Sequence, residues 1–312
     1  MEFLYALGGV IALLLGTDSA MKGVSGAVQQ AKAPPLAAGV TLILLAYALP
    51  GLAAVAGAWV WQGPAMAGFA AWGGALGALG FGAGGLLLVT GVVLRFPWWR
   101  RALWVCALAL ALLGLLVPPA IAALLAAGLL LTWILSAAKL VGTADERAKQ
   151  ELIEFAATRP GWGLNLFRLG FGVLLLLLGA RGLWAAAASI GAWQGFDAGA
   201  MQIVFFALTS GFVVAVVANF NARFGDAAPA LAATVGASLA LAMVATILGA
   251  AATADAGVSF LQRALQHPVL PFLGLAAVLV LFARAEKALS RREGLALVAI
   301  SGVLLALPAF LR

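Results

Sequence analysis

The sequence is poor in charge, in cysteine and in histidine, and each shortage excludes a class of protein. Lys and Arg together number 18 and Asp and Glu 11 in 312 residues, so only 9% of the chain is charged. That is too little for the surface of a water-soluble globule, and too little for a disordered chain. The single cysteine, Cys106, cannot form an internal disulfide.

The single histidine, His267, cannot build a histidine metal cluster or a catalytic triad. The remaining Asp, Ser and Tyr residues show no catalytic spacing. The glycine-rich stretch at 73–85 is not a phosphate loop, because no Lys follows it. We therefore expect no metal site, no cofactor and no enzymatic activity.

Apolar residues dominate: 65% of the chain is hydrophobic, and the mean hydropathy is +1.12. About 20 apolar residues in a helix cross a hydrocarbon layer about 30 Å thick. The sequence therefore predicts an all-α integral membrane protein surrounded by lipids. Its net charge is +7. In a membrane protein an excess of Lys and Arg usually sets the orientation in the bilayer, so we do not expect nucleic acid as a partner. Ten runs are predicted transmembrane helices: 3–31, 36–61, 65–94, 99–116, 118–139, 163–190, 198–222, 228–252, 269–284 and 294–311.

The segment at 140–162 is the one plainly aqueous stretch, and it separates two groups of five predicted helices. If the helices alternate in direction, 14 of the 18 basic residues fall on the side that carries this segment. The positive-inside bias places that side in the cytoplasm and both termini outside, which fits a bacterial inner membrane.

The two groups of helices carry an internal repeat. The run L-L-L-G-T-D at 13–18 recurs as L-L-L-G-A-R at 176–181, so Gly16 and Gly179 are 163 residues apart. Downstream, Gly74 and Gly236 are 162 apart. An odd number of helices per copy inverts the second copy, and inverted repeats are typical of secondary transporters. We predict a first repeat at 1–139, a cytoplasmic linker at 140–162 and a second repeat at 163–312.

Segments of both repeats resemble the cation/calcium exchanger superfamily, which includes the sodium/calcium exchangers. The run G-V-T-L-I-L-L-A-Y-A-L-P-G-L at 39–52 is similar to that family's alpha-repeat signature, G-L-T-I-V-A-x-G-T-S-L-P-E-L. The run R-F-G-D-A-A-P-A-L-A-A-T-V-G-A-S at 223–238 resembles the corresponding segment of the second repeat, and G-T-D at 16–18 resembles the family's G-A-D. The resemblance implies ten helices in two inverted repeats and outward termini.

The resemblance also implies a central ion site built on one glutamate per repeat, and here the sequence departs from the family. Gly51, after Pro50, stands at the first glutamate position, and Val213 or Val214 stands at the second. The amide positions of the eighth helix fall on Ala233 and Ser238. Because Ca²⁺ takes about 6–8 oxygen ligands with compensating negative charge, we expect no chelated divalent cation.

The remaining intramembrane polar residues are the candidate substrate-binding residues. Asp18 lies deep in the first helix, and an intramembrane carboxylate indicates function by default. Lys22, four residues on, would satisfy it in an intrahelical ion pair, which is the structural interpretation. The best cluster is in the seventh helix, where hydroxyls could either line a cavity or bond their own backbone. The full set of candidates is Thr209, Ser210, Tyr47, Asp18, Thr41, Asn219, Thr234 and Ser238.

Three hypotheses for the function follow. The first is a secondary transporter with the exchanger fold that moves a neutral, lipid-like or weakly charged molecule, or a monovalent ion. The second is a non-transporting membrane subunit that keeps the fold as a scaffold for a protein partner. The third is a ten-helix drug/metabolite exporter, which would have cytoplasmic termini.

Overall fold

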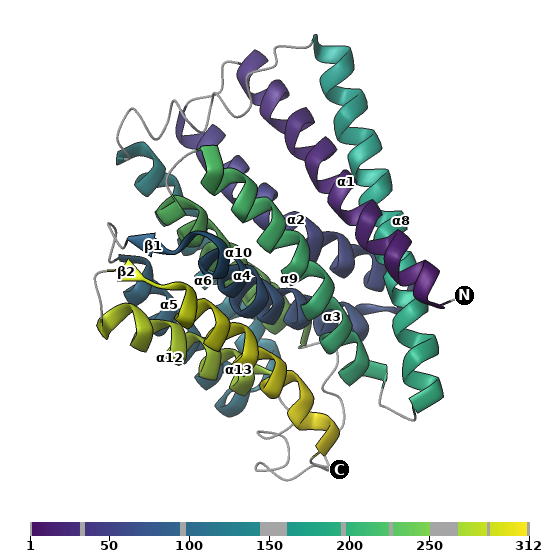
Figure 1. The fold of residues 1–312 in the computed structure, drawn as a ribbon, viewed down its shortest axis with the longest axis vertical. Coiled ribbons are helices and arrows are strands. Elements are labelled where there is room, and N and C mark those ends of the chain that lie inside the picture. Colours follow the sequence, from purple (N-terminus) through teal and green to yellow (C-terminus); the bar gives the residue numbers. More distant parts are fainter. Residues whose placement is uncertain are drawn as a thin grey trace.

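The apolar runs form helices throughout the described part of the chain (Figure 1). The computed structural model describes residues 2–31, 35–93, 98–143, 161–194, 198–224, 227–249, 268–285 and 288–310. The helices of the first half are α1 (Glu2–Gln30), α2 (Pro35–Gln62), α3 (Pro64–Gly77), the π-helix η1 (Ala78–Gly82), α4 (Ala83–Thr90), α5 (Trp98–Leu116) and α6 (Pro119–Thr143). Those of the second half are α8 (Trp162–Gln194), α9 (Ala198–Phe224), α10 (Ala227–Gly249), α12 (Val269–Ala285) and α13 (Arg291–Phe310).

Each of the ten predicted segments therefore coincides with helical structure, and most predicted boundaries lie within a few residues of the observed ones. The predicted linker at 140–162 is shorter at its start, because α6 continues to Thr143. Residues 144–160 lie outside the described part of the chain. The division of the chain at this linker stays a prediction.

The third predicted helix, 65–94, differs most from the prediction. It is one continuous segment of three parts, α3, η1 and α4, and it ends at Thr90 rather than at residue 94. Gly91, with φ 60°, breaks the helix. The short strand β1 (Val92–Val93) follows and pairs antiparallel with β2 (Ala288–Leu289). This two-residue ladder is not predicted by the sequence, and it ties the end of α4 to the start of α13.

Helices α1 and α8 pack side by side over their length (Figure 1). Three glycines spaced by seven residues form the contact face of α1. A Cβ built at these glycines would meet a carbonyl oxygen of α8 in each case: Gly9 at Gly179 (2.9 Å), Gly16 at Gly172 (2.9 Å) and Gly23 at Asn165 (2.7 Å). The residue numbers of the contacts in α8 fall as those in α1 rise, so the two helices are antiparallel. Because they occupy equivalent places in the two repeats, this direction is the one that inversion requires.

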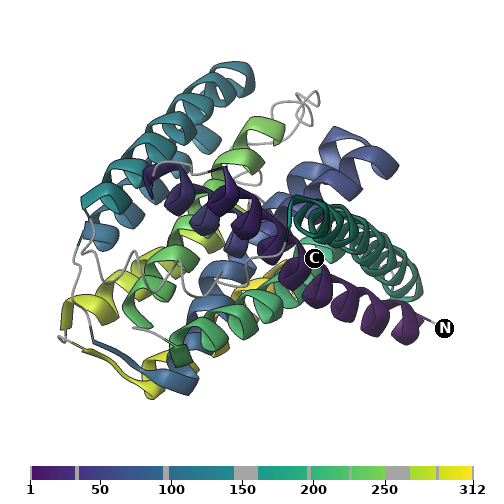
Figure 2. The same cartoon turned by 90° about the horizontal axis from the view of Figure 1, so that it is seen from above.

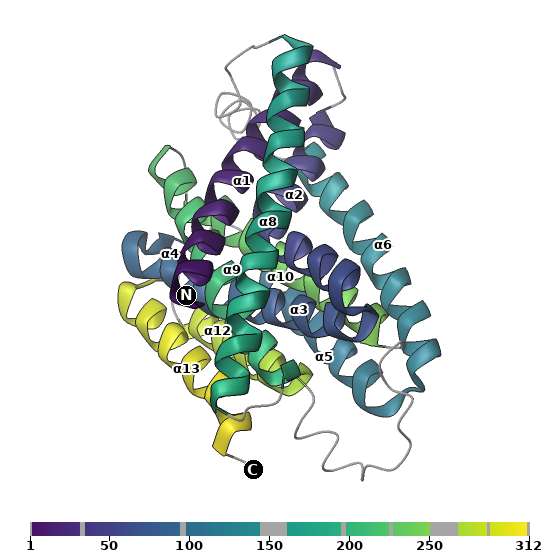
Figure 3. The same ribbon diagram turned by 90° about the vertical axis from the view of Figure 1, so that its right-hand side faces the viewer.

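The α1–α8 pair lies at one side of the molecule, and α5 and α6 lie at another (Figure 2). Figure 3 shows α1 and α8 standing in front of the central helices α3 and α10. The burial of their apolar stretches agrees: 72% of the stretch from α3 to α4 and 78% of that in α10 is buried, against 28% in α1 and 33% in α8. The core thus lies around α3 and α10.

Four helical stretches of the described residues are long and apolar enough to cross a membrane: Glu2–Val24, Met66–Thr90, Trp162–Ala192 and Ala230–Leu248. Four more are apolar but shorter: Leu103–Leu113, Pro119–Trp133, Ile203–Asn219 and Val269–Ala283. Together with the composition, they define an all-α integral membrane protein.

Candidate functional site

The first glutamate position of the exchanger signature is filled by an apolar side chain from another helix. Gly51 of α2 is buried and lies against Gly74 of α3, where a Cβ on Gly74 would be 3.2 Å from the Gly51 Cα. A Cβ built at Gly51 would lie 2.6 Å from Cδ1 of Leu241 in α10. Leu241 is only 1% exposed. Three helices therefore meet here through two glycines and one leucine, and a side chain at Gly51 would require Leu241 to move.

The second glutamate position is apolar as well. Val213 and Val214 are both buried in α9. A Cβ built at Gly82, the last residue of η1, would be 2.8 Å from Cγ1 of Val214 and 3.3 Å from Cγ2 of Thr234. Two of the candidate positions, Val214 and Thr234, thus come together over the π-helix, but they present methyl groups to it. π-turns of this kind are frequent at functional sites.

The candidate hydroxyls bond their own helices, as the backbone-bonding interpretation predicts. The Thr209 hydroxyl donates to the Phe205 carbonyl (2.7 Å) and that of Ser210 to the Phe206 carbonyl. In α10 the same pattern holds, as Thr234 donates to Ala230 (2.8 Å) and Ser238 to Val235 (2.8 Å). Each donor is used locally, so these oxygens can offer a cargo only their lone pairs.

Asn219 of α9 is the candidate whose side chain links two helices. Its amide nitrogen donates to the carbonyl of Ala215 in its own helix (2.8 Å) and to that of Gly85 in α4 (3.2 Å). These two carbonyls fix the orientation of the amide, so its oxygen points elsewhere. That oxygen is buried and accepts no hydrogen bond from the described residues.

Further candidates lie in α2, the helix that also carries Gly51. Tyr47 and Pro50 are buried, and Pro50 lies inside the helix. A proline there removes one backbone donor and leaves the carbonyl four residues earlier without its usual partner. Thr41 belongs to α2, but its side chain lies outside the described part of the structure.

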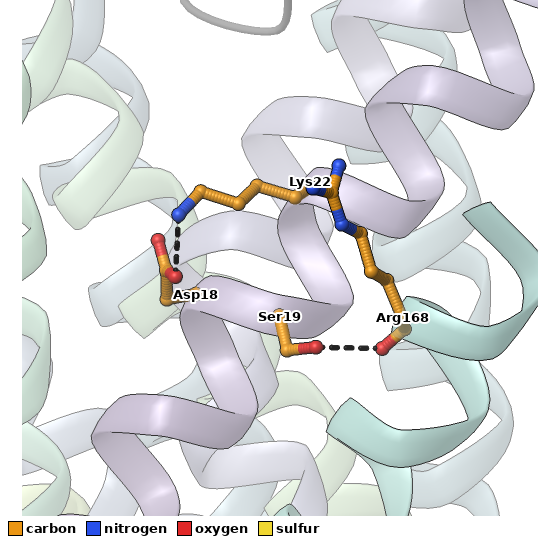
Figure 4. A network of polar contacts seen from close by, with 4 residues as sticks. All are labelled: Asp18, Ser19, Lys22 and Arg168. Atoms are coloured by element: carbon orange, nitrogen blue, oxygen red, sulfur yellow. Dashed lines mark hydrogen bonds and ion pairs between the residues drawn. The ribbon is translucent and has the colours of Figure 1, made fainter. Parts of the chain in front are cut away.

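Asp18 lies on α1 and is not among the residues that meet around Gly51 and Gly82. Its carboxylate forms the predicted ion pair with Lys22, with Oδ2 and Nζ 2.7 Å apart (Figure 4). The Asp18 side chain is 59% exposed and that of Lys22 52% exposed. The intrahelical pair that the sequence predicts is therefore confirmed. Arg181, farther along α8, lies with its guanidinium carbon 5.7 Å from the ring centre of Trp61.

Sequence reasoning missed three features of the structure. Leu241 carries no local signal, because its importance comes from helices that meet it from elsewhere in the chain. The repeat spacing of 162 relates it to Leu79, which is equally buried. The π-helix and Arg168, whose backbone carbonyl accepts a bond from the Ser19 hydroxyl (2.9 Å), were also not predicted. Among the described residues, no group of three His, Cys, Asp or Glu side chains could hold a metal ion.

Known structures share this architecture over nearly the whole chain. The sodium-calcium exchanger NCX_Mj soaked with 2.5 mM Na⁺ and 10 mM Sr²⁺ matches with a TM-score of 0.60 and 17% identity, covering 98% of this chain and 99% of that one. The same exchanger soaked with zero Na⁺ and Ca²⁺ matches with a TM-score of 0.55 and 17% identity, covering 100% and 99%. Neither a known protein family nor a curated protein matches the sequence. The chain therefore has the sodium-calcium exchanger fold, as its signature segments predict.

Proposed function

We propose that this protein is a secondary transporter with the exchanger fold whose cargo is not a chelated divalent cation. The cargo is a neutral, lipid-like or weakly charged molecule, or a monovalent ion. The protein lies in the inner membrane with both termini outside. The exchanger fold over the whole chain favours this architecture over that of a drug/metabolite exporter.

The observation that carries the proposal is the position of Leu241 against Gly51. A divalent cation at membrane depth needs several oxygen ligands and a counter-charge. At this position the chain offers two glycines and a leucine instead, and at the equivalent one it offers Val214. An unpaired divalent ion in such surroundings would keep none of its hydration energy. A neutral cargo does not meet this barrier, and for a monovalent ion the barrier is lower than for a divalent one.

A scaffold without transport activity is the second candidate, and the internal bonding of the hydroxyls favours it. Thr209, Ser210, Thr234 and Ser238 all donate to their own helices. A scaffold needs no polar groups that face a cargo, and it requires a protein partner in the membrane. The transporter and the scaffold would have the same fold, and only a measurement of flux distinguishes them.

Flux measurements on the purified protein in proteoliposomes test the proposal. Na⁺, K⁺ and pH gradients are imposed in turn, and movement of Ca²⁺, Na⁺ and protons is followed against empty vesicles. Movement of a fluorescent phospholipid between leaflets is measured in the same vesicles. We expect no gradient-coupled Ca²⁺ movement, together with flux of a monovalent ion or of lipid. Coupled Ca²⁺ movement would contradict the proposal, and silence in every assay favours the scaffold.

A separate experiment tests the orientation. A reporter that is active only in the cytoplasm and one that is active only outside it are fused in turn to the C-terminus. We expect activity from the external reporter alone. Activity from the cytoplasmic reporter would overturn the assignment of outward termini, and it would favour the topology of the drug/metabolite exporters.

A further inference from the structure

The C-terminal half of α1 carries a polar stripe in a helix that is otherwise apolar. Asp18, Lys22, Gly26 and Gln30 are spaced by four residues, so they follow one ridge of the helix. Ser19 lies beside the same ridge. Between Phe3 and Leu15, α1 contains no charged residue. The stripe therefore begins near the middle of the helix and leads to its C-terminal end.

Helix α8 adds polar groups along the same stripe. The Asn165 amide donates to Oε1 of Gln30 (3.2 Å), and a Cβ at Gly26 would press against the Asn165 side chain. The Ser19 hydroxyl donates to the backbone carbonyl of Arg168 (2.9 Å). Figure 4 shows the Arg168 side chain reaching from α8 across to α1, on the other side of Ser19 from the Asp18 carboxylate.

The stripe carries more positive than negative charge. Lys22 is paired with Asp18, but an ammonium group has three donors and this pair uses one of them. Nη1 of Arg168 is buried and has no hydrogen-bond partner in the described part of the chain. The Asp18 carboxylate is paired with Lys22, and no ion pair of Arg168 is formed among the described residues. A buried charged donor without a partner is unfavourable, so an anionic oxygen ligand would stabilise this arrangement.

Both cations lie between the middle of their helices and the ends that face the same side of the membrane. Arg168 is ten residues from the midpoint of α8, which is about 15 Å at 1.5 Å per residue. That equals half of a hydrocarbon layer about 30 Å thick. Lys22 is six residues, or about 9 Å, from the midpoint of α1. Because α1 and α8 are antiparallel, it lies toward the same membrane face, and its long side chain can reach the headgroups.

The surface next to Arg168 is suited to acyl chains. Its neighbours Leu166, Phe167 and Phe171 are exposed on α8. The rings of Phe167 and Phe171 are stacked, with centroids 5.8 Å apart. A phosphate at Arg168 would therefore have hydrocarbon-compatible surface directly beside it, which a free phosphate ion would not use.

We propose that Lys22 and Arg168, one from each helix of the α1–α8 pair, bind the phosphate of a membrane phospholipid. The guanidinium supplies paired donors that match a phosphate in shape and charge, and the ammonium adds a second cation. The inference rests on the proposed function in that it gives a lipid-like cargo an entry site. Binding itself does not require transport, so the site also serves a scaffold.

The test is a binding titration of the detergent-solubilised full chain by native mass spectrometry. The probes are short-chain phosphatidylglycerol, diacylglycerol with the same acyl chains, and inorganic phosphate. We expect phosphatidylglycerol to bind at least about tenfold more tightly than either of the others, since both the charged group and the chains contribute. If diacylglycerol binds as tightly as phosphatidylglycerol, the proposal is overturned by the unmodified protein alone. Tighter binding of inorganic phosphate would overturn the lipid assignment.

Variants locate the site. Arg168→Gln and Lys22→Gln should each weaken phosphatidylglycerol binding about tenfold, and Arg168→Lys should restore part of it. Arg181→Gln is the matched control, because Arg181 is also an arginine of α8 but lies beside Trp61. It should leave binding unchanged. Equal losses in Arg168→Gln and Arg181→Gln, or no loss in the first, would overturn the assignment. Retained binding with silent flux would reject transport while leaving the lipid site intact.

Discussion

Leu241 of α10 fills the space that a side chain at Gly51 of α2 would need, since its Cδ1 lies 2.6 Å from the Cβ position of that glycine. In the exchanger family the resemblance implies a glutamate at this place. Here the leucine closes the gap between α2, α3 and α10. The chain has therefore not only lost a carboxylate at this position. Leu241 also occupies the volume that the side chain carrying it would need.

This relationship predicts a strong coupling between the two positions. Gly51→Glu should destabilise the protein by more than the overpacking cost of about 1–3 kcal/mol, because it also buries a carboxyl group, and Leu241→Ala by about 2–5 kcal/mol through the cavity that it leaves. The double variant should lose at least about 1 kcal/mol less than the two single losses combined, because the smaller residue makes room for the larger one. Unfolding in detergent measures each free energy.

The control for this cycle replaces a leucine of the same helix. Leu239 is also fully buried in α10, but the three atoms nearest to a Cβ at Gly51 all belong to Leu241. Leu239→Ala combined with Gly51→Glu should give additive losses. If the Leu241 pair proves additive as well, then the leucine does not fill the glutamate position.

A second prediction concerns the close contact of α3 with α9. A Cβ at Gly77 would run into the backbone carbonyl group of Ala207. Because backbone cannot move aside as a side-chain end can, Gly77→Ala should lower the free energy of unfolding by about 1–3 kcal/mol. Gly128→Ala in α6 is the control, since no atom lies within 4 Å of its Cβ position. It should be neutral or stabilise by up to about 1 kcal/mol. Similar losses in both variants would contradict the contact.

The helices could be predicted from the sequence because each rests on a local pattern. Hydrophobic runs bounded by Gly, Pro and charge locate α1, α2, α9 and α10 within a few residues. The spacing of Asp18 and Lys22 likewise predicted their ion pair, since four residues bring two side chains together on any helix.

The contents of the site could not be predicted, because they depend on contacts between distant segments. Nothing in the sequence near Leu241 indicates that two glycines, 190 and 167 positions earlier, leave it room. The π-helix at Ala78–Gly82 has the same glycine-rich composition as its surroundings, and its contact with Val214 comes from a distant segment of the chain. Arg168 became a candidate only because the structure places it beside Ser19 of α1.

A third prediction decides the role of Asp18. The pair with Lys22 is largely exposed, and exposed pairs at this spacing contribute about 0.3–0.5 kcal/mol. Asp18→Asn should therefore lower stability slightly and leave the flux of any transported cargo within about twofold. Asp18→Asn combined with Lys22→Gln should cost little more than either change alone. Complete loss of flux at unchanged thermal stability would instead show that Asp18 couples transport.

The last prediction separates a structural from a cargo-binding role for Ser210. Its hydroxyl bonds the Phe206 carbonyl, which remains a helix acceptor when the hydroxyl is removed. Ser210→Ala should therefore change the free energy of unfolding by less than about 1 kcal/mol. Thr246→Val is the matched control, because Thr246 makes the same bond to Ala242 (2.9 Å) near the end of α10. If Ser210 contacts the cargo, its variant alone should reduce flux by about fivefold or more, since one hydrogen bond is lost. Equal flux in both variants would remove Ser210 from the candidate site and leave its hydroxyl a purely structural group.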